Sequence, residues 1–509
     1  MNIPTAKTAR LRAASAVLML AGVAAGAANA DAPATAAAST YAAASADAAP
    51  PANAAASANA ANCPPISRPP SLSLDAAREA FRDAERRHEW RMREAADPGA
   101  LLRDTRAIVD KNPGMCVSRL AELGERLFEH EYDYADGLGT SAERAANGPF
   151  RRVHDGLVGG PETISCPSCH WVGGPNGAGA ETDNALLAGD GDTLASADAR
   201  NPQALVALGV VQALAHEMTL DLQKQKSDLI SETGGSGPRE KRLVSKGVDF
   251  GVLRVNAKGE LDASGLDGVD ADLVVKPFGW KGTRPDIESF ATEALQLHLA
   301  VDSATELGQG ALKALSAHLA LLEMPIVEPL NQDRVLPAAA TGMLPPTNTS
   351  FVDDFIRGRD EFQSLGCASC HRPMLLLRSA VLEVDGLPPI DLAREMRSPA
   401  IQYDEAVGGY PVWLFSDLKR HDMGAANRAR HEQRGVAPEM YLTPRLWGVA
   451  DSQPYLHDGR APSLDYAIAG HDGEGAAARA AYAALSREDK GALRVYLMSL
   501  RRAPRVVVP

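Results

Sequence analysis

The chain has 509 residues, of which 23% are charged, and its formal net charge is −13 at neutral pH. This acidic balance argues against nucleic acid or an anionic lipid surface as a partner, because both are negatively charged themselves. It fits a donor protein with a basic face, although most of the charge is what a solvated surface ordinarily carries.

The first sixty residues have the pattern of an exported and then disordered segment. Three cations open residues 1–30, an apolar run at 13–26 is too short to span a bilayer, and Ala28-Asn29-Ala30 is a small-residue cleavage site. Residues 31–62 are almost all Ala, Ser, Pro and Asn, which predicts a disordered tether. We therefore expect a periplasmic protein with no membrane span.

Residues 63–117 are expected to form an N-terminal helical extension. The stretch 74–106 is charged with helical spacing around Trp90, and helical character resumes at 116–127. Cys63 and Cys116 are the two cysteines outside the motifs described next, and the sequence leaves open whether they form a disulfide.

Two pentapeptides of the form C-x-x-C-H follow, Cys166–His170 and Cys367–His371. Two thiols at this spacing can each add to a vinyl group of one porphyrin, and the adjacent histidine can bind its iron. A single copy could be a redox dithiol or half of a zinc site. Two copies in an exported chain predict two covalently attached haem c groups, bound through Cys166, Cys169, Cys367 and Cys370 with His170 and His371 as iron ligands.

The chain repeats itself beyond the first motif. Each half contains a helix ending in C-x-x-C-H, a Pro-led apolar segment, a glycine turn, an amphipathic helix and a closing helix. Aligning the turns Phe278–Gly282 and Tyr455–Gly459 places Pro285 on Pro462 without a gap.

The other repeated segments are equally recognisable. The Pro-led segments are Asn201–Leu205 and Thr443–Trp447, and the closing helices are expected at 311–322 and 487–500. The second closing helix begins with a capping box formed by Ser486 and Asp489.

The two halves differ by an insertion and are joined by a linker. The linker is Pro-rich and covers 326–349. The insertion covers about 217–276, where Val252–Val255 and Glu260–Asp262 flank a turn at Asn256–Gly259, a pattern that predicts a β-hairpin in an otherwise helical segment.

The second axial site of each iron separates an electron carrier from an enzyme. For the second haem the leading candidate is His471, which closes an apolar face that begins at Leu464 with helical spacing. Met423 and Met440 compete with it, and His471 could also be a surface residue beside the helix end.

In the first half Ala294 aligns with His471 and cannot bind iron, but His298 lies one helical turn later on the same face. His298 could be a sixth ligand, a distal acid or base above an open iron, or an ordinary helix residue. His154 and His216 are weaker alternatives.

Trp280 aligns with His457 in the two turns, so the repeat places both at the boundary between the halves. An indole between two porphyrins can carry an electron or hold a radical, and an indole packed at an interface is equally common.

Together these stretches resemble the bacterial di-haem cytochrome c peroxidase superfamily, and within it the di-haem oxidoreductase (thiol-oxidoreductase-like) family of peroxidases. The resemblance extends over about 118–505 and rests on Phe278–Gly282, Ser416–Gly424, Thr443–Trp447, Tyr455–Arg460 and His471.

The resemblance implies a mainly α fold with two cytochrome c-like domains in tandem, at 118–325 and 350–505, the first carrying the β-hairpin insertion. It implies that the N-terminal haem reacts with peroxide and that the C-terminal haem takes electrons from a small cytochrome c or cupredoxin.

The resemblance also assigns individual residues. Trp280 matches the inter-haem tryptophan, His298 lies near the distal catalytic glutamate, and His471 stands where the family usually has methionine. The histidine that follows the first motif in the peroxidases has no counterpart in 171–212. A calcium ion between the haems is implied at Asn201 and the carbonyls of Ser452 and Pro454.

We therefore expect a periplasmic di-haem oxidoreductase, peroxidase-like, with His298 and Trp280 as catalytic candidates and hydrogen peroxide as the small oxidant. The alternatives are a di-haem electron carrier without a substrate, and an oxidase that modifies a partner protein.

Overall fold

In the computed structural model, the described residues are 74–140, 151–232, 237–301, 307–325, 349–396 and 400–502. They all belong to one compact unit, Pro50–Pro509. The predicted export signal, the tether, Cys63 and nearly all of the linker lie outside them. Within the described ranges, no helix combines the length and the apolar character that crossing a membrane requires.

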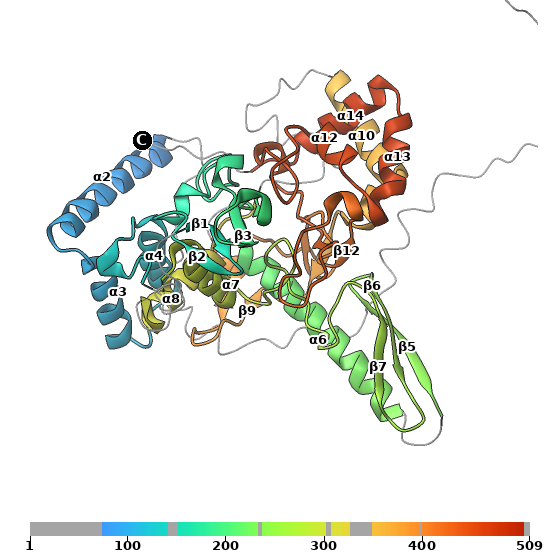
Figure 1. Cartoon of the computed structure of the whole chain (residues 1–509), viewed down its shortest axis with the longest axis horizontal. Helices are drawn as coiled ribbons and strands as arrows, with labels where there is room; N and C mark the ends of the chain where they lie inside the picture. Colours follow the sequence, from blue (N-terminus) through green and yellow to red (C-terminus); the bar gives the residue numbers. More distant parts are fainter. Residues whose placement is uncertain are drawn as a thin grey trace, which may run out of the picture. The chain divides into compact units, whose positions relative to one another are not determined.

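The N-terminal extension is helical, as predicted. Helices α2 (Leu74–Ala96), α3 (Ala100–Lys111) and α4 (Val117–Glu129) follow one another (Figure 1). The guanidinium of Arg126 in α4 lies 4.7 Å from the ring centre of Trp90 in α2, which anchors the extension to the next helix. Cys116, directly before α4, is disulfide-bonded.

Two helix pairs pack in the same way in the two halves of the chain. Helix α4 packs against α8 (Gln309–Ala320), and α10 (Thr349–Ser364) packs against α14 (Arg487–Met498) (Figure 1). Each pair crosses at a glycine, because a Cβ at Gly124 would lie 1.9 Å from the carbonyl oxygen of Ala314 and one at Gly358 2.0 Å from that of Ala492. Helices α8 and α14 are the two predicted closing helices. Their partners α4 and α10 each have a glycine at the crossing, which lets the two backbones approach closely.

The gapless alignment of the two turns is confirmed by their hydrogen bonds. Phe278 N donates to Arg284 O at 3.3 Å and Tyr455 N donates to Ala461 O at 2.8 Å, at aligned positions. The next helices, α7 (Ile287–Ala294) and α12 (Leu464–Ala469), also begin at aligned residues. Asp286 and Ser463 cap them by accepting from a backbone N–H, as the predicted cap Ser486 does for α14.

One repeated element was predicted wrongly in the first half. Helix α10 does lead directly into its motif, but 36 residues separate the end of α4 at Glu129 from Cys166. They include β1 (Arg151–Asp155) and β2 (Val158–Gly160), which join β3 (Ala185–Gly189) and β4 (Asp198–Arg200) in a sheet of order β2-β1-β3-β4. Strands of three to five residues are too short to produce a readable alternation.

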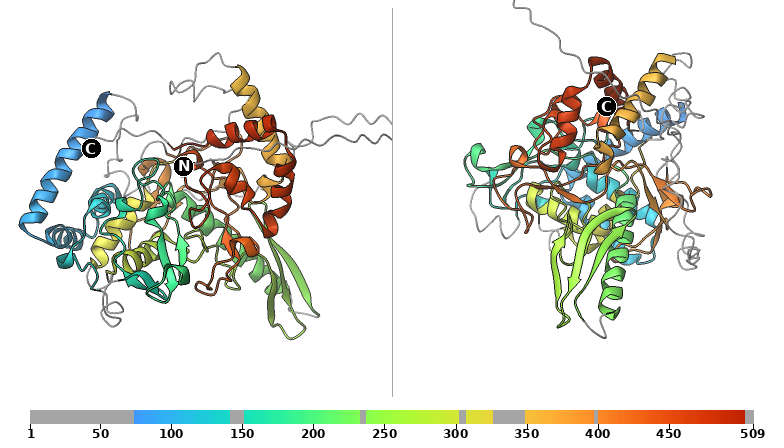
Figure 2. Two further views of the ribbon diagram at one scale, coloured as in Figure 1. Left: turned by 45° about the horizontal axis from the view of Figure 1, so that its top comes forward. Right: turned by 90° about the vertical axis from the view of Figure 1, so that its right-hand side faces the viewer.

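The insertion contains the predicted hairpin and one further strand. Strands β6 (Val248–Val255) and β7 (Leu261–Leu266) pair antiparallel around the turn at 256–259, and β5 (Arg239–Ser245) pairs with the other edge of β6. Helix α6 (Leu208–Glu232) packs beside this three-stranded sheet (Figures 1 and 2).

The remaining elements of the second half are short. Antiparallel pairs join β8 to β11, β9 to β10 and β12 to β13. The bounds are β8 (Leu375–Leu377), β9 (Val381–Leu382), β10 (Ile390–Asp391), α11 (Leu392–Glu395), β11 (Tyr410–Val412), β12 (Arg420–Asp422), β13 (Met440–Leu442) and α13 (Ala476–Ala484). Leucines of both helix pairs, among them Leu123, Leu315, Leu493 and Leu497, belong to one continuous core.

Candidate functional site

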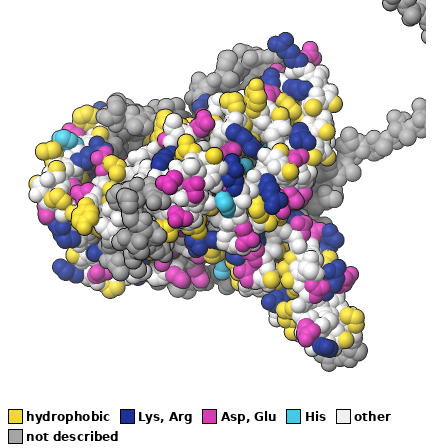
Figure 3. Space-filling view, viewed as in Figure 1, with side chains coloured by type: hydrophobic (Ala, Val, Ile, Leu, Met, Phe, Trp, Pro, Cys, Tyr) yellow, Lys and Arg dark blue, Asp and Glu magenta, His cyan; other side chains and the backbone are white. Residues whose placement is uncertain are grey.

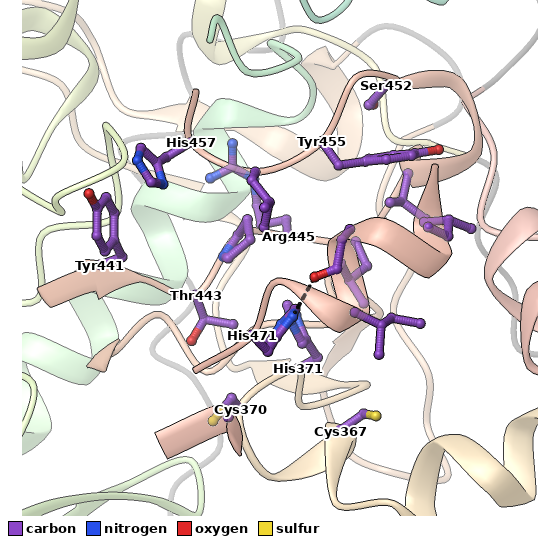
Figure 4. Close-up of a pocket in the computed structure, with 18 of the residues that line it drawn as sticks. Cys367, Cys370, His371, Tyr441, Thr443, Arg445, Ser452, Tyr455, His457 and His471 are labelled. Atoms are coloured by element: carbon purple, nitrogen blue, oxygen red, sulfur yellow. Dashed lines mark hydrogen bonds between the residues drawn. The ribbon is translucent and has the colours of Figure 1, made fainter. Parts of the chain in front are cut away.

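Each C-x-x-C-H pentapeptide opens onto its own cavity. A cavity of about 270 Å³ is lined by Cys367, Cys370 and His371 (Figure 4), and one of about 200 Å³ is lined by the first motif. We call them the C-terminal and the N-terminal pocket. The first Pro-led segment lines both cavities through Asn201–Ala204, as do Trp280 and Arg445, so the two pockets share a wall.

The four motif cysteines are free thiols in the structure. Burial raises the pKa of Cys166 to about 12 and that of Cys367 to about 11. A buried thiol of this kind is a poor thiolate nucleophile and a poor zinc ligand, which disfavours a reactive dithiol at either motif. If these cysteines were attached to a porphyrin, their sulfurs would be thioethers. A thioether sulfur is uncharged, so burial would not be costly for it.

In the C-terminal pocket two imidazoles face each other. The ring centres of His371 and His471 are 6.3 Å apart. A metal held between two imidazoles by nitrogen–metal bonds of about 2 Å would separate the ring centres by roughly 6 Å. The spacing therefore fits one metal ion between the two rings.

Their hydrogen bonds leave the same nitrogen free on both rings. His371 Nδ1 donates to the carbonyl oxygen of Phe415 at 3.3 Å and His471 Nδ1 to that of Ala467 at 2.8 Å (Figure 4 shows the second bond). Burial lowers the pKa of both imidazoles, that of His371 to about 4. Both rings are therefore neutral at pH 7 with Nε2 available, which is the form that binds a metal.

Buried polar atoms around this pocket are consistent with an acidic prosthetic group. Arg445 Nε, Trp447 Nε1 and the Tyr441 hydroxyl have no hydrogen-bond partner in the described part of the chain, although all three residues line the pocket. Burial lowers the pKa of Arg445 to about 10, so it remains a cation at neutral pH. Because a buried cation and unpaired donors are costly alone, carboxylates of a bound porphyrin would satisfy them.

His421, which the sequence reasoning did not single out, also lines the C-terminal pocket. It contacts Asp417 Oδ2 through Nε2 at 2.8 Å and Glu474 Oε2 through Nδ1 at 2.7 Å. Burial opposes protonation of this imidazole, but its hydrogen bonds to Asp417 and Cys370 outweigh burial and raise its pKa to about 11. The pocket therefore has a charged His421 as well as the neutral imidazoles of His371 and His471.

The N-terminal pocket contains one histidine of the same type. His170 Nδ1 donates to Gly177 O at 3.1 Å, and burial lowers its pKa to about 4. Ala294, the counterpart of His471, lines this pocket, as does His298 on the π-helical turn Leu295–Leu299. Among the described residues, no ring contact joins His170 to His298.

Glu162 lies beside His298 and was missed in the sequence. His298 Nδ1 contacts Glu162 Oε2 at 2.6 Å, and the carboxylate lines the same pocket. Burial would raise the pKa of Glu162, but the nearby His154 imidazole and the hydrogen bond with His298 outweigh burial and lower it to about 2. No signal marked Glu162, because it precedes the first motif and lies 136 residues from its partner.

The shared wall contains a set of aromatic rings. Trp280 Nε1 donates to Asn201 O at 2.7 Å, and its ring centre lies 6.5 Å from that of His457. His457 stacks on Tyr441 at 4.5 Å, and Lys281 Nζ lies 3.7 Å from the Tyr441 ring centre. The alignment of Trp280 with His457 thus corresponds to contact between the two turns.

The residues proposed for calcium, Asn201, Ser452 and Pro454, all line the C-terminal pocket. The Asn201 amide donates to the carbonyls of Gly179 and Ala180 and to Asn184 Oδ1. The calcium site stays a prediction.

The alternative iron ligands are distributed differently. Met423 lines the C-terminal pocket, whereas Met440 is not among its lining residues. His154 is buried, 3.3 Å from Glu162, and His216 is exposed.

Two groups of side chains could hold a metal ion in the described part of the chain, Cys370 with Asp417 and His421, and Glu94 with His130 and Asp136. The first group shares its sulfur with the motif. In the second, His130 contacts Asp136 at 2.7 Å and the Glu94 carboxylate accepts from Gly99 N and Leu101 N. These hydrogen bonds already give both acids of the second group a structural role.

Comparison with known proteins supports the resemblance seen in the sequence. Residues 329–500 match the family model described as "Di-haem oxidoreductase, putative peroxidase", which confirms the resemblance over that part of the chain and supports a di-haem redox protein. No curated protein matches.

Solved structures that match include hydrazine synthase from Kuenenia stuttgartiensis pressurised with xenon, with 17% identity over 56% of this chain and 87% of that chain at a TM-score of 0.27. They also include a MauG-like protein associated with microbial copper homeostasis, with 11% identity over 58% of this chain and 89% of that chain at a TM-score of 0.24.

Proposed function

We propose that this chain is a periplasmic di-haem c-type oxidoreductase that reduces a small oxidant such as hydrogen peroxide. The observation that carries the proposal is the difference between the two pockets. The C-terminal pocket has the facing pair His371 and His471, whose ring centres are 6.3 Å apart. The N-terminal pocket is lined by His170 and by a second histidine, His298, which is hydrogen-bonded to a carboxylate.

Each cofactor would be held by one pentapeptide. Cys367 and Cys370 would attach one haem c, and Cys166 and Cys169 the other, within two cytochrome c-like domains. When bound, the haems would supply one-electron chemistry, with electrons arriving on the C-terminal side and leaving for the oxidant on the N-terminal side.

The protein's own groups would divide the work. His371 and His471 would both hold the metal in the C-terminal pocket, which would leave no position there for a substrate. His298 holds a proton beside the N-terminal pocket, where cleavage of an O–O bond needs a proton donor. Trp280 lies in the wall between the pockets and gives electrons a short aromatic path.

The donor of electrons would be a small soluble protein, a cytochrome c or cupredoxin. The net charge of −13 favours a donor with a basic docking face. On the face drawn in Figure 3, Lys and Arg side chains are mixed with Asp and Glu, and no single acidic patch covers it. A calcium ion between the pockets would add a fixed positive charge there.

Spin-state spectroscopy of the purified holoprotein tests the proposal. Absorption and electron paramagnetic resonance spectra should show one low-spin haem with two histidine ligands and a high-spin component from the N-terminal haem. Hydrogen peroxide should be consumed with a reduced small donor protein present. Two low-spin haems in every redox state, with no peroxide consumption, would leave an electron carrier and overturn the proposal.

A second candidate is an oxidase that acts on a partner protein, favoured by the exposed Trp171, which follows His170 and is 53% exposed. It predicts oxidised residues on a partner and little consumption of peroxide with a small donor. Mass spectrometry of the donor protein after turnover separates the two.

A further inference from the structure

Glu162 is a buried carboxylate that the repeat does not predict. It lies four residues before Cys166, and its side chain is only 4% exposed. A carboxylate in such a place is costly unless several donors face it. The groups that contact the Glu162 carboxylate therefore indicate its role.

Glu162 and His298 are joined by two separate hydrogen bonds. The backbone N–H of Glu162 donates to the carbonyl oxygen of His298 at 2.8 Å. The side-chain contact, His298 Nδ1 to Glu162 Oε2, is 2.6 Å. Because both the backbone and the side chain are engaged, the imidazole has little freedom to rotate or to move away from the carboxylate.

The other oxygen of the carboxylate is held from behind. Glu162 Oε1 accepts from the backbone N–H of Leu186 at 3.1 Å and lies 3.3 Å from Nε2 of the fully buried His154. These contacts orient the carboxylate so that Oε2 points at His298. Glu162 and Glu293 act electrostatically to raise the pKa of His298, and His298 in turn helps to lower the pKa of His170.

The partner of Nδ1 distinguishes His298 from three other imidazoles of the two pockets, whereas His421 in the C-terminal pocket also contacts a carboxylate, that of Glu474. His170, His371 and His471 each donate Nδ1–H to a neutral backbone carbonyl. His298 donates to a carboxylate. A carboxylate partner stabilises the protonated ring, whereas a carbonyl partner in a buried place leaves the ring neutral.

We propose that Glu162 is the positioning residue for His298: by accepting Nδ1–H it holds the ring in one orientation and keeps Nε2 as the proton-carrying nitrogen toward the N-terminal pocket. The inference rests on the proposed function, and it makes the pair, and not His298 alone, the unit that delivers a proton to the bound oxidant. The proton leaves Nε2 for an oxygen of the oxidant, and the carboxylate stays ionised.

A double-mutant cycle tests whether Glu162 acts through His298. The rate of reaction with hydrogen peroxide should fall about 100-fold in Glu162→Gln and in His298→Ala, within the range that a positioned general acid supplies. The double variant should be no slower than His298→Ala alone, because the two changes remove the same unit. Additive losses would overturn the proposal.

Chemical labelling supplies a readout that does not depend on turnover. Diethyl pyrocarbonate acylates unprotonated imidazole nitrogens, and the His298 side chain is 35% exposed. Mass mapping should show slow labelling of His298 in the wild type and at least about tenfold faster labelling in Glu162→Gln, and Glu162→Asp should fall between them. Equal labelling in all three would overturn the proposal.

Glu217→Gln is the matched control. Glu217 is also a buried carboxylate, pairing with Lys246 and accepting from Arg378 N and Ser379 N, and it lines neither pocket. The Glu217→Gln variant should leave the labelling of His298 and the rate of reaction with peroxide unchanged. If it changed them as Glu162→Gln does, the proposal would be overturned. If labelling behaves as expected but the wild type does not react with peroxide, the proposed function fails while the positioning role stands.

Discussion

The two pockets are built from one repeat and differ in two positions. Ala294, the last residue of α7, lines the N-terminal pocket, and its aligned counterpart His471, two residues after the end of α12, lines the C-terminal pocket. One helical turn later the first half has His298, which a carboxylate holds. The comparison shows that the same turn and helix can bring two imidazoles face to face or leave the motif histidine without such a partner, depending on where one imidazole stands.

Removing the attachment points should have the largest effect. The double variant Cys367→Ala/Cys370→Ala should lose one of two covalent haems and all oxidation of the donor protein. Cys166→Ala/Cys169→Ala should lose the other haem and keep the low-spin spectrum of the C-terminal one. Intact-mass spectrometry and absorption spectra measure both.

Serines inside the same motifs provide controls. Ser369 Oγ donates to Gly366 O, and Ser168 Oγ contacts Ser165 Oγ, so neither is needed for attachment. Ser369→Ala and Ser168→Ala should keep two haems. Retention of two haems in either cysteine variant would contradict the assignment.

Moving the histidine by one turn should make the N-terminal pocket resemble the C-terminal one. In Ala294→His/His298→Ala the new imidazole stands at the position aligned with His471. We expect the high-spin component to become low-spin and the peroxide rate to fall about 100-fold. His298→Ala alone should keep the high-spin signal, and persistence of that signal in the double variant would argue against the alignment of the two pockets.

The helix crossings should respond equally in the two halves. Gly124→Ala and Gly358→Ala would each force a Cβ against a backbone carbonyl, and each should lower the free energy of unfolding by about 3 kcal/mol. Denaturant unfolding measures the loss. Gly491→Ala in α14 meets only the end of Arg494 at 3.9 Å, so it should be neutral or stabilising, by up to about 1 kcal/mol. Harmless substitutions at both crossings would show that the pairs are not tightly packed.

Acid should weaken a contact that joins the two halves beside the N-terminal pocket. Glu293 accepts from Arg284 and from Arg434, each at 2.7 Å. Burial would raise the pKa of this carboxyl, but hydrogen bonds from Arg284 and Arg434 outweigh burial and lower it. A lowered pKa means that the stabilisation is present above the unfolded carboxyl pKa, about 4.3, and is lost as the pH falls below it.

Glu293→Gln should therefore cost about 2 kcal/mol at pH 7 and progressively less below pH 4, measured by thermal unfolding. Glu395 is the contrasting case, because burial raises the pKa of its carboxyl. Glu395→Gln should destabilise less at pH 7 than at low pH, or not at all. The same pH trend in both variants would contradict the role of the arginines.

Much of the site could be predicted from the sequence, because the relevant spacing is local. The pentapeptides, the turns at 278–282 and 455–459 and the caps Ser463 and Ser486 each depend on residues within a few positions of one another. The gapless repeat then placed His471 on the pocket side of its helix and Trp280 against His457.

The sequence alone determined the two C-x-x-C-H pentapeptides, the register of the repeat and the place of His471 in the C-terminal pocket, since hydrogen bonds of a turn and the period of a helix act over short distances. Only the tertiary structure decided the partner of His298, the glycine crossings and the sheet before the first motif. Those features bring together residues such as Glu162 and His298, 136 positions apart, and chain folding over that distance leaves no local pattern to detect.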